Sequence, residues 1–344
     1  MKRLARVLHC VFAVVLVTGC DRLPIEIDGG DDIAPPISFT GPAPRWITWT
    51  ADGQHVAFEL GGQIVVATGP DMKDAVAISG HSTYGHPSWS PDGLELVYDH
   101  PEDRFRQATM WIRTANPYAD AGDGALEPPR QVADVPRRDW MPAWSPRGDW
   151  IAFHSTRDPG SHVWLIRPSG DGARFLAPAI SEEGSLAWSP DGSELAFVSS
   201  EAGNRGVWVG NPDSGVTRVV GAEVGREGRP RWRPDGKAVG FLSNAGGEYD
   251  VWVAPSAGGT KPVQVTSVGP VVDFGWIADG DAVMFLTSDQ ELYAQHVADG
   301  SEPELLRDAV GFSPSPDGSR YIHVQSIENY FRYFADPVPA EYLP

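Results

Sequence analysis

Histidine is the residue type in this chain that comes nearest to forming a chemical site. His81 and His86 flank the short sequence Ser82-Thr83-Tyr84-Gly85, and His154 and His162 bracket another polar loop. Imidazoles can hold a divalent metal or exchange protons near neutral pH, and either use needs several groups brought together. These four histidines lack a His-x-x-x-His type of spacing, and no companion base is identifiable beside them. We interpret them as ordinary loop and strand histidines, with metal ligation as the alternative.

Other catalytic signatures are absent from the sequence. It contains no Gly-x-Ser-x-Gly nucleophile motif, no glycine-rich phosphate loop and no cysteine spacing typical of a zinc site. The two cysteines are Cys10 and Cys20. We therefore expect no catalytic residues, no metal and no cofactor, and the favoured hypothesis is binding without catalysis.

A repeated turn sequence indicates the elements that would position any site. Trp-Ser-Pro-Asp-Gly or a close variant, followed by an alternating apolar run, occurs seven times. The copies begin at Trp49, Trp89, Trp144, Trp188, Trp232, Trp276 and Pro314. Proline presets the first turn residue and glycine supplies the left-handed one, so each copy predicts the hairpin between two strands. The Asp is expected to form the turn, with no ligand role, and Arg147 replaces it in the third copy.

The spacing of the repeat predicts the architecture. From Trp144 onward, the next three copies follow at intervals of 44 residues. Each interval contains the Trp strand, the turn, an alternating strand, a third strand such as Val207-Trp208-Val209 and a short fourth strand. Four strands without a helical period form one propeller blade. The chain is therefore predicted to be an all-β, seven-bladed β-propeller with four-stranded antiparallel blades.

The seventh blade requires a strand from elsewhere in the chain. After the last turn motif come two strands, Tyr321-Ile322-His323-Val324 and Phe331-Arg332-Tyr333-Phe334. The following segment has three prolines, which makes it a poor ladder partner. Ile37-Ser38-Phe39-Thr40 resembles the fourth strands of the other blades. We predict that this N-terminal strand completes the last blade and closes the ring, which removes an exposed edge.

Such a propeller would gather two sets of loops around one mouth of its central channel. The residues that enter the inner strands are Arg45, His81, His86, Asp139, Trp140, Glu183, Arg226, Glu227 and Asp273. The loops between second and third strands on the same face add Arg157, Asp158, Arg205, Asn244 and Glu248. Mixed charges and a tryptophan in this position could bind a peptide, a glycan or a partner protein. A solvated rim without a ligand is the alternative.

The N-terminus has the order of features found in an export signal. Three basic residues precede an apolar run over residues 7–17, which is too short to span a membrane. Val17-Thr18-Gly19-Cys20 resembles the bacterial lipobox, in which the cysteine is lipidated and becomes the mature N-terminus. We predict a signal peptide over 1–19, a flexible acidic tether over 20–36 and the propeller over 37–344. The protein is then expected in the bacterial cell envelope, anchored to a membrane through Cys20.

The charge of the chain limits its partners. The formal net charge is −19. An acidic body argues against binding to nucleic acid and against broad contact with anionic lipid headgroups. We expect a monomer whose partners are envelope proteins, peptides or glycans.

The repeat also resembles a known family. The Trp-Ser-Pro-Asp-Gly unit with its Leu-Ala-Phe run, Ser-x-Arg-Asp-like loop and Val-Trp-Val strand is similar to the WD40-like propeller repeat of the TolB family. The resemblance covers roughly residues 37–335 and implies an envelope interaction module. The α/β domain that precedes the TolB propeller is not expected in this chain. A seven-bladed relative, oligogalacturonide lyase, holds a divalent metal with channel-facing histidines. The alternatives are therefore a metal-dependent polysaccharide-active enzyme and a surface lipoprotein that captures a substrate.

Overall fold

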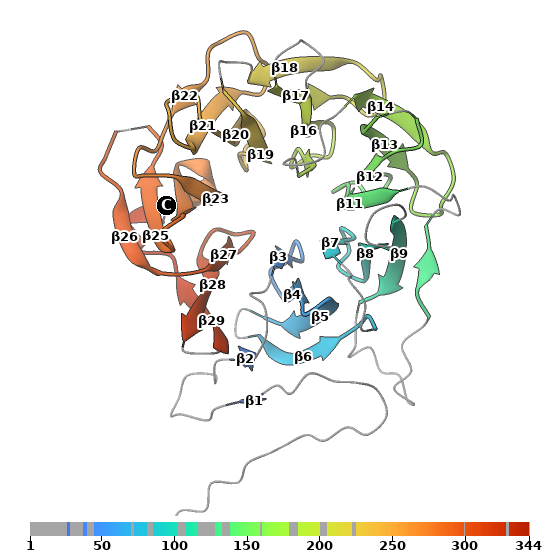
Figure 1. The fold of residues 1–344 in the computed structure, drawn as a ribbon, viewed down its shortest axis with the longest axis horizontal. Helices are drawn as coiled ribbons and strands as arrows, with labels where there is room; N and C mark the ends of the chain where they lie inside the picture. The colour runs from blue at the N-terminus through green and yellow to red at the C-terminus, as the bar shows by residue number, and fades with distance from the viewer. Residues whose placement is uncertain are drawn as a thin grey trace, which may run out of the picture.

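The computed structural model is a ring of β-sheets around a central axis (Figure 1). It describes residues 26–27, 37–39, 45–69, 72–80, 85–101, 108–115, 128–132, 138–158, 160–178, 185–199, 205–221, 225–298, 300–327 and 330–343. Within these residues six sheets have four strands and one has five, and sequential strands pair antiparallel. The predicted all-β, seven-bladed propeller is confirmed.

The blades follow one another along the chain, and within each blade the chain runs from the inner strand outward. Blade 1 contains β3 (Arg45–Trp49), β4 (His55–Leu60), β5 (Gln63–Thr68) and β6 (Lys73–Ala77). Blade 2 contains β7 (Gly85–Trp89), β8 (Glu95–Pro101), β9 (Ala108–Thr114) and β10 (Arg130–Gln131). Blade 3 contains β11 (Asp139–Trp144), β12 (Ile151–Ser155), β13 (His162–Ile166) and β14 (Arg174–Pro178). Blade 4 contains β15 (Ala187–Trp188), β16 (Leu195–Ser199), β17 (Gly206–Gly210) and β18 (Thr217–Gly221).

The remaining blades follow the same order until the last. Blade 5 contains β19 (Glu227–Trp232), β20 (Ala238–Ser243), β21 (Asp250–Pro255) and β22 (Val263–Gln264). Blade 6 contains β23 (Val271–Ile277), the short 3-10 helix η1 (Ala278–Gly280), β24 (Ala282–Thr287), β25 (Glu291–His296) and β26 (Glu304–Asp308). Blade 7 contains β27 (Gly311–Pro314), β28 (Arg320–Ile327), β29 (Tyr330–Pro337), β2 (Ile37–Phe39) and β1 (Glu26–Ile27), and η2 (Ala340–Tyr342) follows β29 in the chain.

Blade 7 joins the two ends of the described chain, as predicted. Ser38 of β2 pairs with Arg332 of β29, and the two strands are antiparallel. β1 adds a fifth strand by pairing Glu26 with Ser38. Two residues of the segment expected to be a tether therefore lie in the edge of this sheet. The rest of that segment, the export signal and Cys20 lie outside the described residues.

The C-terminal segment adds contacts between blades 7 and 6. Tyr342 is only 5% exposed, and its hydroxyl donates a hydrogen bond to the backbone oxygen of Ala294 in blade 6 at 3.1 Å. Its ring also stacks on His296, with centroids 4.7 Å apart. The chain thus leaves blade 7 and packs against blade 6.

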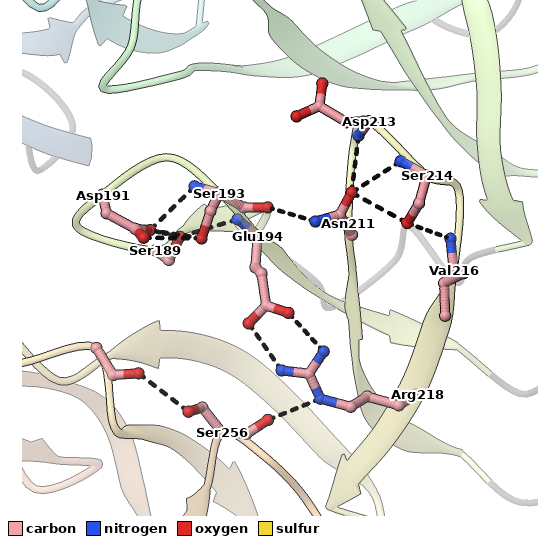
Figure 2. Close-up of polar contacts among 11 residues, drawn as sticks. Ser189, Asp191, Ser193, Glu194, Asn211, Asp213, Ser214, Val216, Arg218 and Ser256 are labelled. Carbon is pink, nitrogen blue, oxygen red and sulfur yellow. Dashed lines mark hydrogen bonds and ion pairs between the residues drawn. The ribbon is translucent and has the colours of Figure 1, made fainter.

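The repeated turn is held by its own side chains. In blade 4 the Ser189 hydroxyl donates to Asp191 at 2.7 Å, and the same carboxylate accepts the backbone N–H of Ser193 at 3.0 Å (Figure 2). The backbone N–H of Glu194 donates to the Ser189 hydroxyl at 2.9 Å. The turns of blades 1, 2 and 7 repeat the hydroxyl-to-carboxylate bond. The turn-forming role predicted for these Asp residues is confirmed.

The tryptophan before each turn connects neighbouring blades. Trp232 Nε1 donates to the backbone oxygen of Ala187, the residue before the tryptophan of blade 4, at 2.9 Å. Equivalent bonds run from Trp89 to Thr48, from Trp188 to Ala143 and from Trp276 to Arg231. Trp49 closes the ring by donating to the Ser313 hydroxyl at 3.1 Å. In these blades the indole N–H thus fixes the spacing of the inner strands.

The hydrophobic core is divided among the interfaces between blades. Seven clusters of buried side chains occur, and each draws on two neighbouring blades. The cluster between blades 7 and 1, for example, packs Phe58 against Tyr333, with ring centroids 5.1 Å apart. Burial of apolar surface, at about 25 cal/mol per Å², therefore holds the blades together as a ring. None of the helices in the described residues is long and apolar enough to cross a bilayer.

Candidate binding site at the mouth

The two axial faces of the ring differ in their loops. On one face, which we call the mouth, the inner strands begin and the second strands end. On the other, which we call the turn face, lie the Asp-Gly turns. The inner strands β3, β7, β11, β15, β19, β23 and β27 surround the axis (Figure 1). The residues that enter these strands were the sequence-based candidates for binding.

Four inner strands share a β-bulge at the mouth, where the register shifts in β3, β7, β11 and β19. Three positions before the tryptophan, the backbone φ is 53° at Trp46, 48° at His86, 52° at Met141 and 49° at Arg229. A left-handed backbone costs a non-glycine residue roughly 1–2 kcal/mol. Such strain persists only where neighbouring contacts enforce it, and it is common at binding sites. These equivalent positions therefore form the best candidate site.

His86 of blade 2 contacts blade 1 directly and is linked to blade 3 through Asp99. Its Nδ1 lies 2.7 Å from Oδ2 of Asp99, and its ring centroid lies 4.0 Å from that of Trp46 in blade 1. Asp99 is 4% exposed, and its Oδ2 also accepts the backbone N–H of Met141 in blade 3 at 2.7 Å. Among the described residues, Nε2 of His86 has no hydrogen-bond partner. A carboxylate at Nδ1 favours the tautomer that carries its proton there, which leaves Nε2 as an acceptor.

Trp46 offers an aromatic surface at this position. Its side chain remains 42% exposed although its ring packs on His86. The packing depends on Gly85, because a Cβ at that residue would lie 3.1 Å from Cζ3 of Trp46 and 3.2 Å from Oδ1 of Asp99. A half-exposed indole fixed on one side is suited to stacking against an apolar or aromatic group of a ligand.

Blades 5 and 6 place charges at equivalent positions. Asp273 Oδ1 accepts a hydrogen bond from Arg231 Nη2 at 2.9 Å, and Arg229 Nη1 lies 3.3 Å from the same oxygen. The Arg229 side chain is 52% exposed. One carboxylate therefore faces two guanidinium groups, which leaves a net positive charge able to pair with an acidic group of a ligand.

Several predicted mouth residues instead stabilise blade 3 from within. Asp139 is 3% exposed, and it accepts hydrogen bonds from Ser155 Oγ and from Arg157 Nη2, each at 2.6 Å. Trp140 is 7% exposed and stacks on the fully buried His154, with ring centroids 5.8 Å apart. The structure thus places Asp139, Trp140 and Arg157 together, but as a buried network between β11, β12 and the loop after β12.

The predicted residues around blade 5 fall into two groups, residues that connect strands or blades and residues that are exposed at the mouth. Glu227 is 1% exposed, and its backbone oxygen accepts a hydrogen bond from Arg205 Nε at 2.8 Å, which links blades 4 and 5. The Asn244 side chain accepts the backbone N–H of Arg226 at 2.7 Å and so shapes the start of β19. Arg226, Glu248 and Asp158 are exposed on this face. The structure describes neither the side chain of Arg45 nor any part of His81 or Glu183.

The described histidines do not come together. His162 packs edge-on against Phe175 of β14, whereas His154 lies under Trp140 and His86 pairs with Asp99. No group of three or more His, Cys, Asp or Glu side chains in the described ranges is arranged to hold a metal ion. The metal-site alternative thus finds no ligand set in the described part of the chain.

Most residues that carry the candidate site were not predicted from the sequence. Trp46, Asp99, Met141, Arg229 and Arg231 were not among the predicted residues, although His86 and Asp273 were. A signal was present in the prolines that follow three of the bulged residues, at positions 87, 142 and 230. Proline inside a paired strand indicates a bulge, because it cannot donate to the ladder.

Comparison with known proteins identifies the family. The sequence pattern of the TolB beta propeller domain matches residues 123–332, which is more than half of the chain. The chain belongs to the TolB beta propeller domain family. A comparison with curated protein sequences gave no match.

Solved structures share the fold of this TolB-family propeller. A TolB from Agrobacterium tumefaciens has 21% sequence identity and a TM-score of 0.55, with 77% of this chain and 95% of that chain covered. TolB from Acinetobacter baumannii has 13% identity and a TM-score of 0.51, covering 85% of this chain but 63% of that one. Oligogalacturonate lyase from Vibrio parahaemolyticus has 13% identity and a TM-score of 0.67, with 93% and 98% covered. At these identities the likeness concerns the fold alone.

Proposed function

We propose that the protein is an exported, lipid-anchored propeller of the bacterial cell envelope that binds a peptide segment of a partner protein at its mouth. The observation that carries the proposal is the row of bulged, left-handed residues Trp46, His86 and Met141, linked across three blades. A fold that maintains strain at equivalent positions of adjacent blades is suited to present those side chains to a ligand.

The chemistry of the mouth favours a peptide. Trp46 offers a stacking surface, and His86 packs against its ring and fixes it in place. Arg229 and Arg231 outnumber the single carboxylate of Asp273 in blades 5 and 6. An extended segment with an apolar or aromatic side chain and a separate acidic group would engage both regions.

The predicted lipobox supports the anchor. Val-Thr-Gly-Cys follows an apolar run too short to span a bilayer. The paired strand β1 begins six residues after Cys20. Six residues span at most about 20 Å, so a lipid on Cys20 would hold the edge of blade 7 close to the membrane. Cys20→Ser is expected to move the protein from the membrane pellet to the soluble fraction.

A pull-down from detergent-solubilised membranes tests the mouth. The protein is expected to retain a discrete set of envelope proteins, and Trp46→Ala is expected to reduce their recovery by about ten-fold or more. Val216→Ala is the matched control, because Val216 is 65% exposed on the β17–β18 connection of the turn face. Equal recovery with wild type and Trp46→Ala would contradict the proposal, as would binding on a glycan array without any captured protein.

A further inference from the structure

A groove lies on the turn face between the Asp-Gly turns of blades 4 and 5. Its volume is about 540 Å³, within the range of ordinary ligand sites. Ser189, Asp191 and Glu194 line one side, and Trp232 and Asp235 line the other. It is separated from the mouth by the length of the inner strands.

The equivalent space between blades 3 and 4 is filled by an arginine of the chain itself. Arg147, which stands in place of the turn Asp, reaches across to blade 4 and donates from Nε to the backbone oxygen of Asp191 at 2.9 Å. Its Cγ lies 2.8 Å from where a Cβ on Gly192 would be, so the arginine stem lies directly on that glycine. Its Nη1 is 3.8 Å from the Asp213 carboxylate of blade 4.

The equivalent space between blades 5 and 6 also holds an arginine. Arg233 stands where five of the six other copies have Ser or Thr, and its stem lies against Gly280 of blade 6 so closely that a Cβ there would overlap it. Its Nε donates to Asp235 Oδ1 at 2.9 Å. The nearby carboxylates of Asp235 and Asp281 help to raise the pKa of Arg233. The two gaps that flank the groove are therefore each filled by an arginine side chain. The guanidinium groups of Arg147 and Arg233 contact carboxylates or a backbone oxygen there.

The groove between blades 4 and 5 lacks such a filling side chain among the described residues. The glycine of its far turn, Gly236, has only Pro190 Cδ near its Cβ position, at 3.9 Å. Glu194 is neutralised by Arg218, whose two terminal nitrogens bind its two oxygens at 2.5 and 2.7 Å (Figure 2). Asp235 is paired with Arg233. The carboxylate of Asp191 accepts hydrogen bonds from hydroxyl and backbone donors of Ser189 and Ser193. Arg147 binds the backbone oxygen of Asp191, and its charge helps to lower the pKa of the carboxyl.

We propose that this groove binds an arginine side chain of a partner peptide, in the place that Arg147 and Arg233 occupy in the two neighbouring gaps. Glu194 and Asp235 are hydrogen-bonded to Arg218 and Arg233, whereas no guanidinium of the described residues is hydrogen-bonded to the carboxylate of Asp191, which is left to accept a ligand. The planar guanidinium suits a carboxylate and backbone oxygens together. Hydrogen bonds from Ser189 and Ser193 lower the pKa of Asp191 to about 2, so it is ionised at neutral pH. The site lies on the opposite face from the mouth and is independent of binding there.

Ligand-observed NMR with the purified protein tests this site. The probe is acetyl-Gly-Arg-Gly-amide, and the same peptide with citrulline in place of arginine is its uncharged control. Asp191→Arg copies the Ser-Pro-Arg-Gly turn of blade 3, and the introduced arginine side chain is expected to fill the groove. Asp92→Arg makes the same change in blade 2, where it alters a different gap, and is the matched control. If Asp191→Arg does not fold, Ser189→Arg copies the turn of blade 5 instead.

The expected result is saturable binding of the arginine peptide that Asp191→Arg weakens by about ten-fold or more, with unchanged binding by Asp92→Arg. The citrulline peptide is expected to bind about ten-fold more weakly than the arginine peptide. Equal binding by wild type and Asp191→Arg would overturn the proposal. Equal binding of the two peptides, or no saturable binding by the wild type, would overturn it as well.

Discussion

At the scale of single residues, the tryptophan before each turn links two blades. Its ring belongs to the apolar cluster at a blade interface, and its Nε1 donates to the inner strand of the preceding blade. Blades 3 and 7 lack this hydrogen bond, because Trp144 Nε1 has no hydrogen-bond partner among the described residues and blade 7 has Pro314 in place of the tryptophan. Pro314 has no donor, and it packs instead on Gly275, where a Cβ would lie 2.8 Å from the proline Cγ. The motif tolerates proline at this position because the neighbouring glycine leaves room for the ring.

Comparing two tryptophans isolates the contribution of this hydrogen bond. Trp232 and Trp144 are both 8% exposed, but Trp144 Nε1 has no hydrogen-bond partner among the described residues. Trp232→Phe removes the bond to Ala187, and it is expected to lower the free energy of unfolding by about 1 kcal/mol more than Trp144→Phe does. Denaturant unfolding measures both variants. Equal losses would show that the indole N–H contributes nothing.

His323 makes the ring sensitive to acid. It is 1% exposed between Arg307 and Asp336, and burial lowers its pKa from 6.5 to about 3. As the pH falls below 6.5 the unfolded chain binds a proton that the folded chain does not. Stability is therefore lost by up to roughly 1.4 kcal/mol per pH unit until the pH reaches the folded pKa.

Replacing this histidine tests the effect. His323→Gln is expected to flatten the loss of stability between pH 6.5 and pH 4, relative to the stability of the same variant at pH 7. Thermal or denaturant unfolding across that range gives the comparison. Parallel pH profiles for wild type and variant would exclude His323 as the source of the acid sensitivity.

At the scale of elements, the repeat predicted the blades, whereas the bulges at the mouth were not predicted. A turn such as Trp188 to Glu194 depends on contacts within a few residues, so its sequence is sufficient to identify it. The left-handed state of His86 depends on Asp99 in the next strand and on Trp46 and Met141 in other blades. Contacts of that kind arise only once the ring has formed.

The burial of charged residues at the mouth also could not be predicted from the sequence. Asp139 and Glu227 occupy the predicted positions at the start of inner strands, but they are 3% and 1% exposed. Asp139 is stabilised there because Arg157 and Ser155 satisfy its oxygens. The sequence of a loop does not show whether a charged residue in it will be buried against a hydrogen-bonding partner from the next strand.

The joining of both chain ends at blade 7 predicts a large effect of a small deletion. Removing residues 36–41 deletes β2, which pairs with β29 and carries β1. The ring would lose its closure and expose the edge of β29. The variant is expected to aggregate or to melt at a clearly lower temperature, as scanning calorimetry and light scattering would show. An unchanged melting curve would mean that β2 does not close the ring.

At the scale of the whole molecule, the propeller presents two different axial faces. The mouth combines an exposed tryptophan with paired arginines, and the turn face carries the groove between blades 4 and 5. The N-terminal strands lie at the edge of blade 7 (Figure 1). An anchor at that edge would leave both faces accessible in the envelope.

Site-specific photocrosslinking in intact cells tests the central claim, binding at the mouth, most directly. A photoreactive phenylalanine derivative at position 46 keeps an aromatic ring in place of the indole and would report on the mouth, and the same derivative at exposed position 216 would report on the turn face. We predict discrete crosslinked protein bands from position 46 that position 216 does not give. Identical bands from both positions, or none from position 46, would contradict binding of a partner protein at the mouth.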